Sequence, residues 1–196
     1  MINKLSKFFT NKLFVNGVIS EDEQELYIYG LFMLISQLMY LTLACLLGLI
    51  LGCFVESIIF YIAFQIIRRY AGGYHATTEA RCEILSTLSI LACIILIKLS
   101  KVYDIQTVFL IISVISSVCI FFLCPLDTPE KPLSDKEAKY FRKISWIVLF
   151  VIDMVIILFD SFNLQFIFIP CCISLIFESI LLILGKLKKC LVIRNQ

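Results

Sequence analysis

The sequence contains few charged residues and only one histidine. Charged side chains make up 16% of its 196 residues, hydrophobic residues make up 61%, and the mean hydropathy is +0.99. Because a soluble domain has about a quarter charged and about half apolar residues, this composition excludes an ordinary soluble domain and indicates a membrane protein. A single histidine also excludes the HExxH zinc site of metalloproteases, which needs two.

The nine cysteines lack the spacing of a metal site. No CxxC pattern is paired with a histidine, so we expect no zinc site. We also expect no cofactor and no nucleic-acid partner. Cys82 lies in polar surroundings. Six others lie inside apolar runs, where cysteine behaves as a small hydrophobic residue: Cys45, Cys53, Cys93, Cys119, Cys171 and Cys172.

The first 20 residues lack the long apolar core and the small-residue cleavage site of a secretory signal. Lysines alternate there with apolar side chains, which predicts a helix lying on the cytoplasmic surface of the membrane. A plain soluble leader fits the pattern equally well. The residues concerned are Lys4, Lys7, Phe8, Phe9, Lys12, Leu13 and Phe14.

Long apolar runs predict an all-α, polytopic membrane protein with about six spans, since a spanning helix needs about 20 mainly apolar residues. We expect residues 1–196 to form a single membrane-embedded domain. The first two spans turn near Gly48 and Gly52, and the last two turn at the polar stretch DSFN, residues 160–163. The predicted spans are 27–47, 49–67, 83–99, 105–124, 144–160 and 164–184.

The basic residues predict the orientation of these spans in the membrane. If both termini are cytoplasmic, all 17 lysines and arginines except Lys98 and Lys101 lie on the cytoplasmic side. The polar loops 68–82 and 124–143 then face the same compartment. Because the cytoplasm is reducing, Cys82 is expected to be a free thiol.

The loop sequence RRYAGGYHATTEARC, residues 68–82, contains both His75 and Cys82. An imidazole is the usual group that converts a thiol into a nucleophilic thiolate, and it can then donate the proton to a leaving amine. These two residues are therefore the candidate catalytic pair. A histidine in a cytoplasmic loop can also be incidental, so the pair alone is a weak motif.

The separation of seven residues would place the two side chains about 10 Å apart along a continuous helix, which is too far for a hydrogen bond. Gly72 and Gly73 permit an irregular turn. We therefore expect His75 to fold back over the start of a helix that Thr77 or Thr78 caps, and so to reach Cys82.

Other polar groups of this segment have two interpretations. The backbone N–H groups of Gly72 and Gly73 could stabilise an oxyanion. Three arginines could either take part in catalysis or anchor helix ends at the lipid head groups: Arg68, Arg69 and Arg81. Candidates for orienting His75 by proximity are Gln65, Glu79 and Glu83.

The segment 68–82 resembles the motif of the accessory gene regulator B (AgrB) family, membrane-embedded cysteine endopeptidases that process quorum-sensing propeptides in Gram-positive bacteria. The family places a cysteine seven residues after a histidine, an arginine seven before it and a glycine two before it, which here are Cys82, Arg68 and Gly73 around His75. A second family feature, P-x-D-x-x-x-K-P, is matched by PLDTPEKP at 125–132. The resemblance covers nearly the whole chain.

The resemblance implies a two-step reaction on a propeptide of the AgrD type. Cys82 would attack the bond before the acidic C-terminal tail with His75 as base, leaving a thioester that an internal cysteine or serine of the propeptide displaces to close a thiolactone or lactone ring. Asp127 and Lys131, which match the second motif, would either fix their loop through a salt bridge or bind substrate. The resemblance also implies a homodimer in contact with membrane lipid.

Two other functions compete with this interpretation. A small transporter of a peptide or ion would depend on Asp153 and Glu178 rather than Cys82, but the sequence shows no internal repeat and no matching pair of Gly/Pro-broken helices. A non-catalytic scaffold would tolerate replacement of Cys82 by serine. The acidic residues inside the spans, Glu56 included, are otherwise expected to support helix packing, line a polar cavity or lie at a subunit contact.

Overall fold

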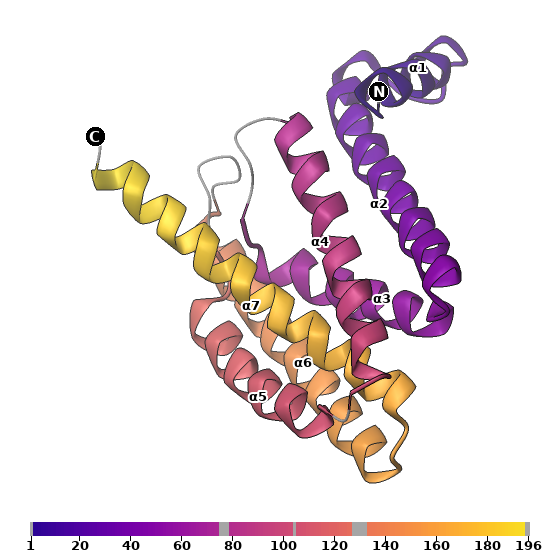
Figure 1. Cartoon of the computed structure of the whole chain (residues 1–196). Helices are drawn as coiled ribbons and strands as arrows, with labels where there is room; N and C mark the ends of the chain where they lie inside the picture. The colour runs from indigo at the N-terminus through magenta and orange to yellow at the C-terminus, as the bar shows by residue number, and fades with distance from the viewer. Residues whose placement is uncertain (1, 75–78, 104, 127–132, 195–196) are drawn as a thin grey trace. The chain divides into compact units, whose positions relative to one another are not determined.

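The computed structural model describes residues 2–74, 79–103, 105–126 and 133–194, and helices dominate all four segments (Figure 1). The predicted all-α class is confirmed, and each predicted span corresponds to a helix. The helices form two compact units, residues 1–43 and 44–196. The elements are α1 (Ile2–Val15), the short 3-10 helix η1 (Glu21–Glu23), α2 (Gln24–Leu51), α3 (Phe54–Ala71), α4 (Glu79–Ser100), α5 (Gln106–Leu123), α6 (Asp135–Ser161) and α7 (Gln165–Arg194).

The first unit contains α1, η1 and most of α2. The helix predicted for the N-terminal segment is confirmed, and it ends where Gly17 adopts a φ of +68°. Its apolar side chains Phe8, Phe9 and Phe14 are exposed. A helix with exposed aromatic residues and interleaved lysines suits a membrane surface, and that location stays a prediction.

Among the described residues, five helices have the length and composition of a membrane span, α2 with η1 and α4 to α7. The chain is therefore a multi-pass membrane protein. The remaining predicted span, 49–67, corresponds to α3 and lies outside this set because its 18 residues include Glu56, Arg68 and Arg69. Glu56 pairs with Lys101, just after α4, and Arg68 pairs with Glu178 of α7, so two of these charges have partners on neighbouring parts of the bundle.

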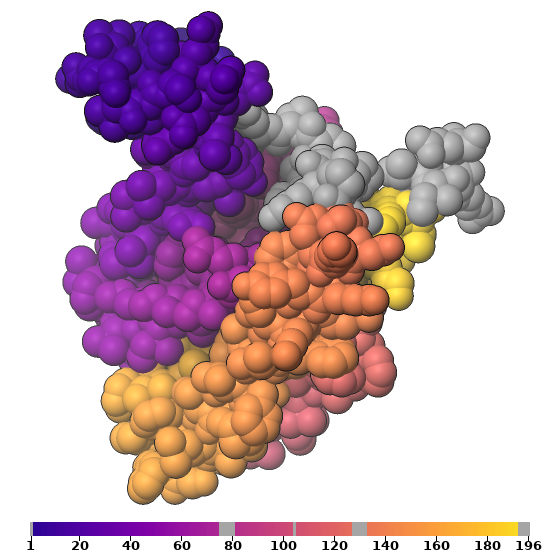
Figure 2. Space-filling view, turned by 180° about the vertical axis from the view of Figure 1, so that it is seen from behind, coloured from indigo at the N-terminus to yellow at the C-terminus, as the bar shows by residue number. Residues whose placement is uncertain are grey.

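Helix α7 is the centre of the second unit. It packs against α3, α4, α5 and α6 (Figure 1), and 61% of its span is buried, against 22% for α4, α5 and α6. Phe177 of α7 contacts Phe64 of α3 with ring centroids 5.1 Å apart. Figure 2 shows α6, in orange, lying across one face of this unit beside the magenta α3. The most apolar helix is thus enclosed by the others.

The second unit has polar groups inside and apolar groups outside, as a bundle in lipid should. On α5, Ser113 and Ser116 are buried, and the Ser179 hydroxyl of α7 donates to that of Ser116 at 3.1 Å. The opposite side of α5 exposes large apolar residues to the surroundings. Small hydroxylated residues let helices approach closely and bond to each other where no water is present. The exposed residues of α5 include Ile111, Val114, Ile115 and Val118.

The two predicted turns differ in how they are built. The turn at 160–163 is confirmed, with α6 ending at Ser161 and Asn163 at a φ of +57°. The first turn is centred on Gly52, at a φ of +70°, whereas Gly48 stays inside α2. A Cβ at Gly48 would lie 2.6 Å from the Ser57 hydroxyl oxygen, so this glycine serves close packing of α2 on α3.

The predicted extent of the second polar loop, 124–143, is wrong. Helix α6 begins at Asp135, because Ser134 and Glu137 form a capping box in which the Ser134 hydroxyl accepts from the Glu137 N–H at 3.3 Å. Lys139 and Arg142 therefore lie on a helix. The described residues between α5 and α6 are 124–126, 133 and 134.

Replacing Ser134 by alanine is expected to lower the free energy of unfolding by about 1 kcal/mol, the usual cost of losing an N-cap. Thermal unfolding in detergent would measure it. Ser36→Ala is the matched control, because the Ser36 hydroxyl bonds only to the Phe32 carbonyl oxygen of its own helix. An equal loss from both variants would contradict a capping role.

Candidate functional site

The candidate nucleophile lies near the start of α4. Cys82 is the fourth residue of this helix and is partly exposed, so it lies near the helix start that the sequence predicts after Thr77 or Thr78. His75 belongs to segment 75–78, together with the two threonines predicted to cap α4, and this segment lies outside the described residues. The predicted approach of His75 to Cys82 therefore stays a prediction.

Two glycines end α3 just before this segment. Gly72 has a φ of +83° and donates its N–H to the Arg68 carbonyl oxygen at 3.1 Å, while Gly73 has a φ of +140°. A Cβ at Gly72 would lie 2.7 Å from the Leu126 carbonyl oxygen. Both positions need glycine for backbone shape and space. The Gly72 N–H is thus engaged at the end of α3, and the oxyanion role predicted for the two glycines stays a prediction.

The second polar loop is bonded directly to the first. The Leu126 N–H donates to the Ala71 carbonyl oxygen at 2.8 Å, and Gly72 and Leu126 form a parallel backbone bridge. The prediction that the two loops share one end of the molecule is thereby supported. Asp127 and Lys131 follow within 127–132, outside the described residues, so their predicted ion pair stays untested.

Arg68 is the polar centre of the described part of this site. Its Nη2 donates to the Tyr74 carbonyl oxygen at 2.9 Å, and its Nη1 lies 3.7 Å from Oε2 of Glu178 on α7. The guanidinium also lies over the Phe64 ring, 5.7 Å from its centroid. Only 22% of the side chain is exposed, so Arg68 points into the protein instead of anchoring the helix at the head groups.

One face of α7 supports the backbone that precedes His75. Glu178, Leu181, Gly185 and Lys188 follow one another at helical spacing, so they share a face. A Cβ at Gly73 would lie 3.6 Å from the Leu181 Cβ, and one at Gly185 would lie 3.2 Å from the Tyr74 nitrogen. The Lys188 ammonium lies 5.6 Å from the centroid of the Tyr74 ring.

Sequence reasoning missed this face because the predicted span ended at residue 184. The available signal was Gly185 itself. A glycine between apolar and basic residues of a continuous helix, which reaches Arg194 here, indicates close approach of another backbone as readily as a helix end.

The other sequence candidates are partly accounted for. Gln65 donates to the Tyr61 hydroxyl at 2.7 Å, one turn earlier on α3. Glu79 is the first residue of α4, and Glu83 is partly buried next to Cys82. Asp153 of α6 accepts a hydrogen bond from Ser117 of α5 at 2.8 Å, which fits the helix-packing alternative among its predicted roles.

The other cysteines differ from Cys82 in their surroundings, although all nine are free thiols. Cys124, at the end of α5, is buried, and burial raises the pKa of its thiol, which makes it a poor nucleophile. Cys190 is exposed on the C-terminal half of α7. Of these residues, Cys82 alone combines partial exposure with a place next to the polar loop.

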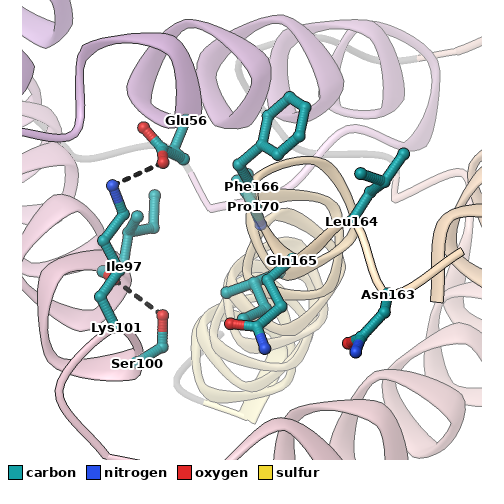
Figure 3. Close-up of a pocket in the computed structure, with 10 residues that line it drawn as sticks. Glu56, Ile97, Ser100, Lys101, Asn163, Leu164, Gln165, Phe166 and Pro170 are labelled. Carbon is teal, nitrogen blue, oxygen red and sulfur yellow. Dashed lines mark hydrogen bonds and ion pairs between the residues drawn. The ribbon is translucent and has the colours of Figure 1, made fainter.

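A second candidate site is a cavity of about 290 Å³ at the other end of the bundle (Figure 3). It is lined by α3, α4, the α6–α7 turn and the start of α7. Lys101 points at Glu56 across it, with 2.6 Å between the ammonium nitrogen and the carboxylate oxygen. The described lining residues include neither cysteine nor histidine, so this cavity suits no thiol chemistry: Glu56, Ile97, Ser100, Lys101, Asn163, Leu164, Gln165, Phe166, Ile169 and Pro170.

Removing Lys101 as Lys101→Met should destabilise the protein, because Glu56 is 7% exposed and would lose its counter-charge. We expect the free energy of unfolding to fall by more than the value for an exposed ion pair, about 1 kcal/mol, and by less than the value for a buried one, about 3 kcal/mol. The effect is intermediate because the Lys101 side chain is 40% exposed. The thermal unfolding of Lys101→Met would be compared with that of Lys98→Met, because Lys98 is exposed and lies at the same end of the bundle. Equal stability of the two variants would show that the pair contributes nothing.

Comparison with known proteins gives a family match and relatives that agree with one another. The family model described as accessory gene regulator B matches residues 4–183. An AgrB-like protein 2 of Clostridium perfringens strain 13 is 30% identical over 169 residues, covering 81% of this chain and 79% of the relative. Accessory gene regulator protein B of Staphylococcus intermedius is 33% identical over 111 residues, covering 56% and 57%, and that of Staphylococcus aureus MRSA252 is 29% identical over 111 residues, covering 55% and 58%. No solved structure matches significantly.

Proposed function

The chain belongs to the accessory gene regulator B family, and we propose that it is a membrane cysteine endopeptidase that removes the C-terminal tail of an autoinducing-peptide precursor. Family membership carries a role in the accessory gene regulator system. The observation that supports the finer proposal is the placing of Cys82. This partly exposed thiol lies near the start of α4 and follows segment 75–78 in the chain, and the backbone before that segment is held by Arg68, Leu126 and α7.

In the first step, the Cys82 sulfur attacks the carbonyl carbon of the peptide bond before the tail, and its proton passes to His75. The tetrahedral intermediate collapses as His75 returns the proton to the departing amine. The tail leaves with a new amino terminus, and the rest of the precursor stays on Cys82 as a thioester.

In the second step, an internal cysteine or serine of the precursor attacks that thioester. A thiolactone or lactone ring closes, and Cys82 leaves as a thiol. Thioester exchange is nearly balanced, whereas hydrolysis is downhill, so cyclisation requires that water be kept from the thioester. A site at the surface of a membrane bundle favours this exclusion. Mostly linear product from wild-type protein would argue against it.

The remaining motif residues support the pair in this proposal. Gly72 and Gly73 give the backbone its turn, and Arg68 holds the carbonyl before His75. Asp127 and Lys131 either brace their own loop or bind the precursor.

Both termini and both polar loops face the cytoplasm in this proposal. Residues 1–196 act as one domain. The partners of the protein are the AgrD-type precursor, a second copy of the chain and membrane lipid.

The transporter alternative has no specific support among these observations. Its two candidate ion-handling residues are engaged within the bundle, Asp153 with Ser117 and Glu178 with Arg68.

Intact mass spectrometry in detergent tests the proposal. Purified protein would be incubated with a propeptide from the same genome that has an amphipathic N-terminal segment, an internal cysteine and an acidic tail. We expect a hydroxylamine-sensitive mass increase equal to the propeptide minus its tail, present in wild type and absent in Cys82→Ala and His75→Ala. Tail release by Cys82→Ala without an adduct would overturn the proposal.

A further inference from the structure

Glu178 is a fully buried acidic residue in the middle of the central helix. Among the described residues, neither of its carboxylate oxygens has a hydrogen-bond partner, and the same holds for Nη1 of Arg68, its ion-pair partner at 3.7 Å. Burying a carboxylate with incomplete hydrogen bonding is unfavourable, particularly in a membrane protein. A hydrophobic residue would suit packing alone better, so the carboxylate needs another explanation.

Arg68 connects this carboxylate to the backbone next to the reaction site. The guanidinium approaches Glu178 through Nη1 and donates through Nη2 to the Tyr74 carbonyl oxygen at 2.9 Å. That carbonyl belongs to the peptide bond between Tyr74 and His75. Glu178 is therefore connected to His75 through one ion pair, one hydrogen bond and one peptide bond.

The space around the guanidinium is closed on several sides, so its orientation is specific. Phe64 lies on one side of it, and a side chain at Gly73 would collide with Nη1. Arginine suits this place because its planar fork can face two partners at once, whereas a lysine ammonium is a single point charge.

We propose that Glu178 is a positioning residue for His75, acting through Arg68 on the Tyr74 carbonyl. The proposal rests on the proposed function of His75 and Cys82. The carboxylate keeps the guanidinium inside the bundle. Without that charge, the long arginine side chain would turn toward the polar head groups, as such side chains do near helix ends, and would release the Tyr74 carbonyl.

The test compares Glu178→Gln with wild type in steady-state cleavage of the same propeptide. Glutamine keeps the size and removes the charge. We expect kcat to fall about 10- to 100-fold, as misplacement of a catalytic group does, while KM changes less than about threefold. Glu178→Asp should recover part of the lost kcat. Glu56→Gln, the same change in a buried acidic residue of the other ion pair, should keep wild-type kcat.

A double-mutant cycle with Arg68→Lys separates positioning from a general packing effect. If Glu178 acts through Arg68, the double variant should lose no more kcat than Arg68→Lys alone. Independent, multiplying losses would overturn the proposal. Thermal unfolding of every variant accompanies the kinetics, and if Glu178→Gln fails to fold, Glu178→Asp takes its place in the cycle with the same criterion.

The two proposals fail in different ways. If Cys82→Ala is inactive and Glu178→Gln keeps wild-type kcat, the positioning role is wrong and the proposed function stands. If Cys82→Ala still releases the tail, the proposed function is wrong, and the positioning role falls with it.

Discussion

Tail release should fall by on the order of 10⁴- to 10⁶-fold when Cys82 is replaced by alanine, because removal of a covalent nucleophile leaves only binding and the surrounding electrostatics to act. The initial rate of tail release, followed by chromatography and mass spectrometry, measures this directly. Cys82→Ser should also be severely impaired, since a hydroxyl is a much weaker nucleophile than a thiolate beside the same base.

Two other cysteines provide controls for this result. Cys190 is the most accessible thiol and could mislead an experiment based on thiol reagents, whereas Cys124 lies beside the second polar loop but is buried. Cys190→Ala and Cys124→Ala should retain tail release within about threefold of wild type, the ordinary range for substitutions that do not touch reacting atoms. A Cys82→Ala variant that keeps a tenth of the activity would exclude thiol catalysis at this position.

The second large effect is expected from a helical glycine. Replacing Gly185 by valine should lower kcat about 100-fold, because its Cβ would lie 3.2 Å from the Gly73 carbonyl carbon and from the Tyr74 nitrogen and would push this backbone away from α7. The added methyl groups need still more room. Tail release and thermal unfolding would be measured together.

Gly30→Val is the matched control for this substitution. Gly30 also lies inside a helix, but nothing lies within 4 Å of the place where its Cβ would be. Valine and glycine differ by less than about 1 kcal/mol in helix propensity, so the control should keep both stability and activity. If both variants were equally active, close contact between α7 and the loop would have no catalytic importance.

The sequence was sufficient to predict the class of fold and the existence of all six long helices, because apolar length is a direct property of the chain. Helix ends were less predictable. Ser134 and Glu137 start α6 well before the apolar run does, and a hydropathy-based assignment overlooks such a polar first turn. Their S-x-x-E spacing carried the missing information.

The candidate site was predictable only as a set of residues. Residue types indicated His75 and Cys82, and the family resemblance added Arg68 and Gly73, but neither contained information on what each side chain touches. The ion pair of Arg68 with Glu178 joins residues far apart in the sequence, as does the bond from Leu126 to Ala71. Such contacts depend on which helix becomes central, and no local pattern encodes that choice.

The central position of α7 has a consequence for how the protein is made. Helices α3 to α6 precede it in the chain and leave the ribosome first, yet each of them packs against α7 in the finished bundle. Until α7 is inserted, Arg68 lacks Glu178 and Ser116 of α5 lacks Ser179, the partners that they have in the bundle. The arrangement around Arg68 can therefore be completed only after the last of these helices has entered the membrane.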